Sequence, residues 1–192
     1  NTLQLNNGNG TFSEIGQIAG IEATEWSWSA LFADYDNDGL KDLFISNGYR
    51  QDIINLDFVV YGDKEQSMGL DPADDKERQA LLNELPGIKV HNYMYKNKGD
   101  LTFSDVSESW GLSEPTYSNG AAYADLDNDG DLDLVINNID TVASVWESHV
   151  KKAEGVKQSN YLRIALAGPP QNREGFGTKV YIRNNGSLQY QY

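Results

Sequence analysis

Hydrophobic residues in this chain fall in short runs that are separated by clusters of Asn, Asp and Gly. Two such runs, at residues 30–33 and 43–46, flank one strongly acidic loop, and two more, at 121–124 and 134–137, flank a second. Short runs with β-branched and aromatic residues, bounded by turn formers, are typical of buried strands. The pattern therefore predicts two units in which an acidic loop joins two strands.

The two units belong to an internal repeat. Residues 6–46 and 97–137 align at a constant offset of 91 without a gap. Each copy also begins with a Gly/Asn turn and a short predicted strand, at 11–15 and at 102–106. Several short strands separated by turns fit a repeated antiparallel sheet such as a propeller blade. A single blade cannot bury both of its faces, so we expect neighbouring blades to stack.

The predicted fold class is mainly β, with β-propeller-like blades that form a partial propeller and a small helical insertion. The chain divides into a first repeat at residues 1–48, an insertion at 49–96, a second repeat at 97–150 and the start of a C-terminal β segment at 160–192. A closed propeller needs more blades than two repeats supply.

One helix is predicted inside the insertion, at about residues 72–85. Asp71 is a suitable N-cap, Pro72 suits the first helical position, and the Pro86 that follows cannot continue the helix. Leucines give this helix a narrow apolar face, so we expect it to pack on the sheets.

The last third of the chain predicts further strands. Residues 142–146 fit either helical spacing or a strand, and their β-branched content favours a strand. Beyond a polar linker, residues 160–168, 177–186 and 187–192 are interpreted as three strands joined by turns.

The two acidic loops have the layout of a calcium cage. DYDNDGLKD at 34–42 and DLDNDGDLD at 125–133 place carboxylates at loop positions 1, 3, 5 and 9 and a glycine at position 6. Like charges this close repel by about 1 kcal/mol per pair at 4 Å in bulk water, and more at lower dielectric, so a cation is needed to hold them. The candidate ligands are the side chains of Asp34, Asp36, Asp38, Asp42, Asp125, Asp127, Asp129 and Asp133, with the backbone carbonyls of Leu40 and Asp131 at position 7. We therefore predict two Ca²⁺ sites.

Two other interpretations of the loops are less consistent with the sequence. An EF-hand requires a glutamate at position 12, where this chain has Ile45 and Ile136, so the loops are not EF-hands. Asp, Asn and Gly also form turns that bind no metal. Two full copies of the nine-residue pattern, each followed by an apolar strand, favour the metal.

The charge of the chain limits its partners. The formal net charge is −14, and the two loops contain nine of the 29 acidic residues. Nucleic acids and anionic membranes bind basic patches, and none is visible, so neither is an expected partner. There is no cysteine for a disulfide or a thiolate metal site. No apolar run is long enough to cross a bilayer and no leader is present, so we expect a processed chain or a fragment without direct membrane insertion.

These residues resemble a known family. The segments DYDNDGLKDLFISNG and DLDNDGDLDLVINN resemble the FG-GAP or VCBS-type repeat of integrin α-chain propellers and bacterial surface proteins. NYLRIALAG with NREGFGTKVYIRNNG is similar to the ASPIC/UnbV module. The resemblance implies propeller blades, calcium in the loops, and a role in recognition or adhesion outside the cytoplasm, whether extracellular, at the cell surface or periplasmic.

Catalysis is not expected from this sequence. Paired carboxylates are typical of glycosidases, but a cation accounts for the regular acid spacing. His91 and His149 are the only imidazoles and have no neighbouring nucleophile motif. Most aromatic residues are expected in the core. Trp26 and Trp28, however, share one face of an extended segment and could contact a ligand.

The leading hypothesis is a calcium-stabilised, non-enzymatic repeat module of an exported or cell-surface protein, which binds a protein or glycan partner. The alternative is an accessory or substrate-binding part of a polysaccharide-processing enzyme whose catalytic residues lie outside this chain. A third hypothesis, a calcium sensor, is disfavoured because loops flanked by strands offer no hinge.

Overall fold

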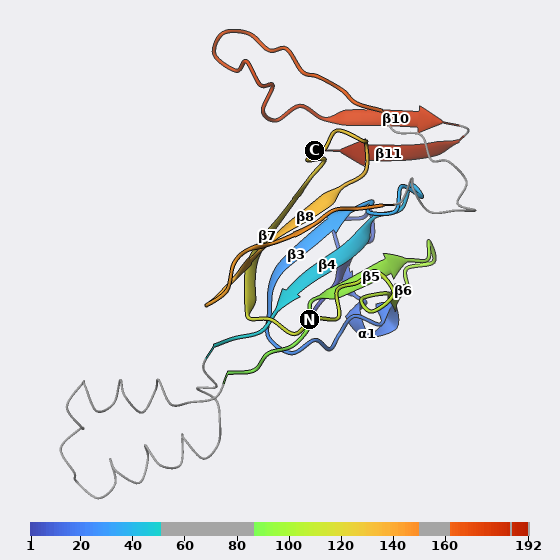
Figure 1. The fold of residues 1–192 in the computed structure, drawn as a ribbon. Helices are drawn as coiled ribbons and strands as arrows, with labels where there is room; N and C mark the ends of the chain where they lie inside the picture. The colour runs from blue at the N-terminus through green and yellow to red at the C-terminus, as the bar shows by residue number, and fades with distance from the viewer. Residues whose placement is uncertain (51–86, 150–161, 185, 192) are drawn as a thin grey trace, which may run out of the picture.

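The structure is a computed structural model, and it describes residues 1–50, 87–149, 162–184 and 186–191. Within these residues the fold is mainly β and consists of several antiparallel sheets, as predicted (Figure 1). The predicted helix at about 72–85 lies outside the described residues. Among the described helices, none combines the length and the apolar character needed to cross a membrane.

Four antiparallel sheets make up the described fold. The N-terminal hairpin and the first large sheet contain β1 (Gln4–Asn6), β2 (Phe12–Glu14), β3 (Ser27–Ala33), β4 (Asp42–Asn47), β5 (Tyr93–Asn97) and β6 (Phe103–Asp105), with the short helix α1 (Gly16–Ala19) after β2. The second large sheet and the C-terminal hairpin contain β7 (Ser118–Ala124), β8 (Asp133–Asn138), β9 (Ser144–Trp146), β10 (Val180–Asn184) and β11 (Ser187–Gln191). The strand orders are β1-β2, β3-β4-β5-β6, β7-β8-β9 and β10-β11.

The sequence repeat is reproduced in the backbone. Strands β7 and β8 have the same lengths and relative positions as β3 and β4. Both hairpins even carry a register shift at the same place, between Ser27 and Ala30 in β3 and between Ser118 and Ala121 in β7. The local strand geometry therefore follows the duplicated sequence closely.

The sheets cross the boundaries expected from the sequence. Strand β5 lies almost wholly within the predicted insertion at 49–96, yet it pairs with β4. Strand β6 lies in the predicted second repeat at 97–150, yet it completes the first sheet through β5. The four-stranded sheet therefore combines the two strands that flank the first loop with β5 and with β6, the first strand of the second repeat.

The C-terminal prediction is partly wrong. Residues 162–168 of the expected strand at 160–168 form no strand. Their apolar alternation fits a strand, but no strand among the described residues pairs with their backbone, and Leu162 is 66% exposed. The next two expected strands do form as the hairpin of β10 and β11, and β9 lies within the expected strand at 142–146.

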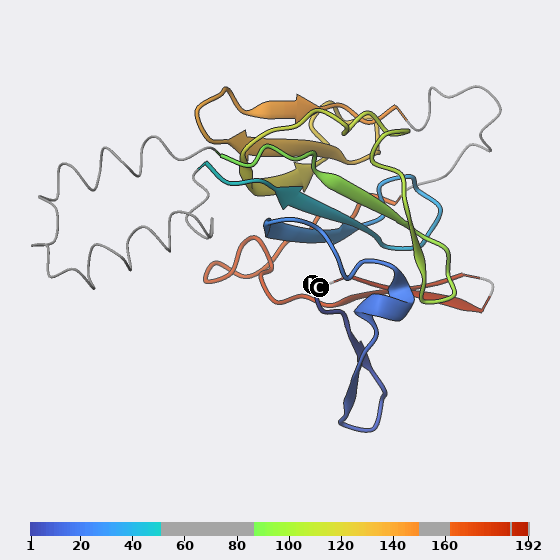
Figure 2. The same cartoon turned by 90° about the horizontal axis from the view of Figure 1, so that it is seen from below.

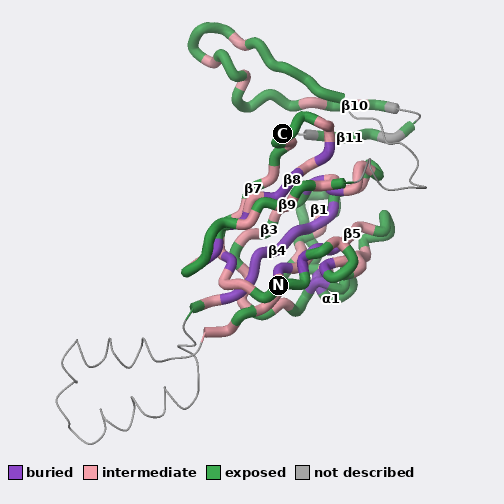
Figure 3. Tube along the Cα trace, viewed as in Figure 1, coloured by how far each residue is buried: buried purple, intermediate pink, exposed green. Residues whose placement is uncertain are grey.

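The central strand β4 is buried over its whole length (Figure 3). Phe44 packs into one apolar cluster together with Met94, Leu134 and Ile136. The neighbouring Leu43 and Ile45 pack into a second cluster, formed with Ala19, Ile21 and Tyr95. The sheet of β3–β6 is therefore covered on one face by the β7–β9 sheet and on the other by α1 and the adjoining Ile21, while the N-terminal hairpin projects away from the sheets (Figure 2).

Polar contacts join the two large sheets through β3, β4 and β7. The Ser46 hydroxyl donates to the carbonyl oxygen of Asn119 at 2.5 Å, and the Ser29 hydroxyl donates to the same oxygen at 3.0 Å. The Ala121 N–H in turn donates to the Ser29 hydroxyl at 3.2 Å. These bonds satisfy backbone groups near the register shift of β7, and they fix how the two sheets stack.

Candidate functional site

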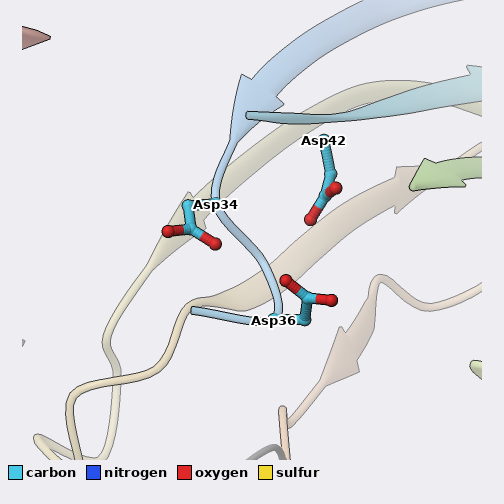
Figure 4. A group of neighbouring side chains, drawn as sticks. All are labelled: Asp34, Asp36 and Asp42. Atoms are coloured by element: carbon cyan, nitrogen blue, oxygen red, sulfur yellow. The ribbon is translucent and has the colours of Figure 1, made fainter. Parts of the chain in front are cut away.

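The first acidic loop brings three carboxylates together (Figure 4). Asp34 directly follows β3, Asp42 opens β4, and the pairing of Ala33 with Asp42 closes the loop between them. One oxygen from each of Asp34, Asp36 and Asp42 lies within 4.8 Å of the others. The strand register therefore brings the first and last acids of the loop close to each other and to Asp36.

The backbone of both loops adopts the turn that the sequence predicts. Gly39 and Gly130 have φ values of 92° and 89°, and Asn37 and Asn128 are also left-handed, at 57° and 63°. A residue with a Cβ is strained at the glycine positions. In the first loop the Gly39 N–H donates to Asp34 Oδ2 at 2.9 Å, so the turn also orients a carboxylate.

The ninth residue of each loop also attaches the loop to its sheet. Asp42 is fully buried and accepts hydrogen bonds from the N–H groups of Tyr35 and Asn97. In the second loop Asp133 accepts from Leu126 and Ser148 in the same way. Burial raises the pKa of Asp42 to about 6, although these N–H groups lower it, and nearby loop carboxylates raise it further.

The second loop gathers the carboxylates of Asp125, Asp127 and Asp129, again within 4.8 Å of one another. Asp131 is only 1% exposed, and neither of its carboxylate oxygens has a hydrogen-bond donor among the described residues. Burial raises the pKa of Asp131 to about 6, and Asp129 and Asp133 reinforce the shift. The Ser148 side chain approaches the carboxylate and opposes the shift, without forming a hydrogen bond of normal geometry. A buried carboxylate without donors is costly unless a cation or a proton accompanies it.

Some predicted ligands stand outside these converging groups. Asp38 and Asp133 do not belong to them, and neither does the Asp131 side chain. In the first loop position 7 is Leu40, whose side chain packs close to Gly99. The role of the position 7 carbonyls stays a prediction.

Two contacts at the loops could not be anticipated from the sequence motif. The Lys96 ammonium, on β5, contacts the Asp36 carboxylate and lies 2.8 Å from Asp38 Oδ2. The Asn37 amide donates to the carbonyl oxygen of Gly130 at 3.4 Å. The two loops are therefore neighbours at one edge of the stacked sheets, and the first is already paired with a positive charge.

The chemistry of these loops suits calcium. The gathered side chains offer only oxygen, which calcium and magnesium prefer over softer metals. The second loop contains three buried oxygen atoms that accept no hydrogen bond from the described residues: Asp125 Oδ1 and both carboxylate oxygens of Asp131. Calcium accepts six to eight oxygen ligands in flexible geometry, so it tolerates carboxylates and carbonyls from one irregular loop better than magnesium does.

Comparison with known protein families matches residues 1–45 and 82–136, just over half of the chain, to the FG-GAP-like repeat. The chain belongs to the FG-GAP-like repeat family. FG-GAP repeats are typical of extracellular repeat modules. The match includes both acidic loops and stops before the C-terminal hairpin, so the ASPIC/UnbV resemblance stays a prediction. A search of curated proteins gives no match.

An aromatic cluster lies at the opposite end of β3 from the acidic loop. The Trp26 ring centroid is 6.2 Å from that of Trp28 and 4.9 Å from that of Tyr49. Trp28 is 53% exposed, and its indole N–H donates to the Gly48 carbonyl at 2.8 Å. That bond fixes the orientation of an exposed ring. By contrast, Tyr95, which also stacks on a neighbouring tyrosine, is buried in the core.

Proposed function

We propose that this FG-GAP repeat chain is a calcium-stabilised, non-enzymatic module of an exported or cell-surface protein, and that it recognises a protein or glycan partner. The observation that carries the calcium role is Asp131, a fully buried carboxylate with two unpartnered oxygens beside three converging acids. Calcium would supply the positive charge that these acids lack. The residues that would hold it are those of the two loops, 34–42 and 125–133.

The position of the loops supports a structural role for the cation. Each loop joins the first two strands of a large sheet. Its last acid accepts a hydrogen bond from the backbone at the end of the third strand or just beyond it. Repulsion among the acids therefore acts directly on the first hairpin of each large sheet. Extracellular modules bind calcium at about 10⁻⁴ to 10⁻³ M, so external calcium at millimolar concentration keeps such sites largely filled. A site with a Kd 100-fold below the free calcium concentration would add about 2.7 kcal/mol to folding.

The surroundings of the two histidines support a non-enzymatic role. The His91 ring packs on Tyr93, with 4.4 Å between the ring centroids. His149 Nδ1 is 3.0 Å from the backbone carbonyl oxygen of Glu147, and its Nε2 is 3.5 Å from the carboxylate of the same residue. Both rings therefore have close local partners, and neither lies beside a serine or cysteine nucleophile motif in the sequence.

The partner is proposed to bind at the cluster of Trp26, Trp28 and Tyr49. An exposed indole held by a backbone hydrogen bond offers a rigid apolar face at little entropic cost, which suits stacking on a sugar ring or packing against a protein. The cluster lies away from the acidic loops, so calcium and partner would occupy separate places on the module.

Thermal unfolding in 2 mM calcium and in excess chelator tests the calcium role. We expect a lower melting temperature in the chelator, and a smaller response to calcium in Asp36→Ala and Asp127→Ala. Identical unfolding curves in both buffers would overturn the structural role of calcium.

Glycan-array and pull-down binding with calcium present test recognition, using Trp28→Ala against the exposed control Phe12→Ala. Loss of binding in the first variant alone is expected. Turnover of a bound polysaccharide by the chain itself would overturn the non-enzymatic proposal.

A further inference from the structure

Beside the two loops, one equivalent position carries opposite charges. The Asn97 N–H donates to the ninth carboxylate of the first loop at 2.9 Å, and the Ser148 N–H donates to the ninth carboxylate of the second loop at the same distance. Asn97 and Ser148 are therefore equivalent positions, and so are the residues that precede them. Those residues are Lys96 beside the first loop and Glu147 beside the second, where the Glu147 carboxylate lies 3.5 Å from His149 Nε2.

Lys96 gives the first loop a cation of its own. Its ammonium contacts Asp36 and lies 2.8 Å from Asp38 Oδ2, with the side chain about one-third exposed. Asp36 is one of the three converging acids of this loop. An ammonium at this distance offsets much of the repulsion that would otherwise open the loop. It also occupies oxygens that a metal ion would need.

The second loop is more acidic at two equivalent positions. Position 7 is Asp131 where the first loop has Leu40, and Glu147 stands where the first loop has a lysine. Both Asp131 oxygens are buried without donors. Arg163 reaches this loop, but it donates to the amide oxygen of Asn128 at 2.8 Å. This loop therefore depends more on an added cation than the first loop does.

We propose that Lys96 is a resident cation of the first loop, which calcium must displace from Asp36 and Asp38. The two repeats, although duplicated in sequence, then differ in affinity, and the second loop fills at lower calcium concentration. The inference rests on the proposed calcium role. Lys96 then sets the calcium concentration at which the first loop fills, and so the range over which only the second loop is occupied.

Calorimetric titration of the full chain with calcium chloride, after removal of bound metal, tests this inference. We expect two classes of site in the unaltered chain. Lys96→Met removes the charge and keeps most of the side-chain length, and it should tighten the weaker site roughly tenfold, the change produced by about 1.4 kcal/mol. Asp127→Asn should abolish the tighter class and so assign it to the second loop.

The reciprocal variant Glu147→Lys places an ammonium at the equivalent position and should weaken the tighter site. Lys98→Met, a lysine in the turn after β5 that lies beside Asp100, is the matched control and should change neither site. If the two sites have equal affinity, and neither Lys96→Met nor Glu147→Lys changes that affinity, the inference is overturned while the proposed calcium role stands. Weaker binding in Lys96→Met would also overturn it, because the lysine would then support the loop that holds the metal. No calcium binding by any variant would overturn the proposed function itself.

Discussion

The backbone N–H of Asn97 lies 2.9 Å from Oδ1 of Asp42, so the last acid of the first loop is also a hydrogen-bond acceptor for the third strand of its sheet. Its other oxygen accepts from the Tyr35 N–H at 3.2 Å. Position 9 of the loop thus has a structural role that does not require a metal ion.

Comparison of two neutral variants of Asp42 isolates this acceptor role. Asp42→Asn keeps one acceptor oxygen, whereas Asp42→Ala keeps none and leaves a further buried N–H unsatisfied. In chelator the alanine variant should be less stable than the asparagine variant by about 1–3 kcal/mol. Urea unfolding measures the difference. Equal stability would show that the strand N–H finds another acceptor.

Asp131→Asn should change stability in opposite directions with and without calcium. Without metal, the variant removes a buried charge that has no hydrogen-bond donor, so the melting temperature should rise. With calcium, the variant should gain less from the metal than the unaltered chain does. Glu108→Gln, at an exposed acid outside both loops, serves as the control. A loss of stability in both buffers would contradict the prediction.

The stability of the metal-free chain should fall as the pH rises from about 4 to about 6. The pKa values of Asp42 and Asp131 are raised from 3.8 to about 6 in the folded chain. In this pH range the folded chain therefore binds more protons than the unfolded chain, and folding becomes less favourable as those protons leave.

Melting temperatures after dialysis against chelating resin, across this pH range, check the sign. Saturating calcium should reduce the loss, because it favours the ionised carboxylates. A metal-free chain that became more stable between pH 4 and pH 6 would contradict the prediction.

Ser46→Ala tests the contact between the two large sheets. The variant removes the bond to the Asn119 carbonyl and the bond that the Ser46 hydroxyl accepts from the Ser29 N–H. Because Ser46 is fully buried, the free energy of unfolding should fall by about 1–3 kcal/mol. Ser104→Ala, on the edge strand β6, is the control and should be nearly neutral. An equal effect of both variants would contradict an inter-sheet role.

Local features of the repeats could be predicted from the sequence, whereas contacts between residues distant in the chain could not. The strands on either side of each loop and the positive φ of Gly39 were predicted, because apolar runs and turn residues determine them locally. Lys96 was missed because it approaches Asp36 only through the pairing of β4 with β5, across 60 residues of chain. No local pattern encodes that approach. The expected strand at 160–168 was wrong over its described residues, 162–168, because its alternation fits a strand but no described strand pairs with it.

Because β4 is buried on both faces, its length and register are constrained more tightly than its exact side chains. Because side chains alternate along a strand, a shift of β4 by a single residue would send Phe44 into the cluster of Leu43 and Ile45 and draw Asp42 out of its loop. Insertions and deletions within 42–47 should therefore be far less tolerated than substitutions that conserve size. The same holds for β8, which carries Leu134 and Ile136, so variation in length is expected outside the two hairpins that hold the acidic loops.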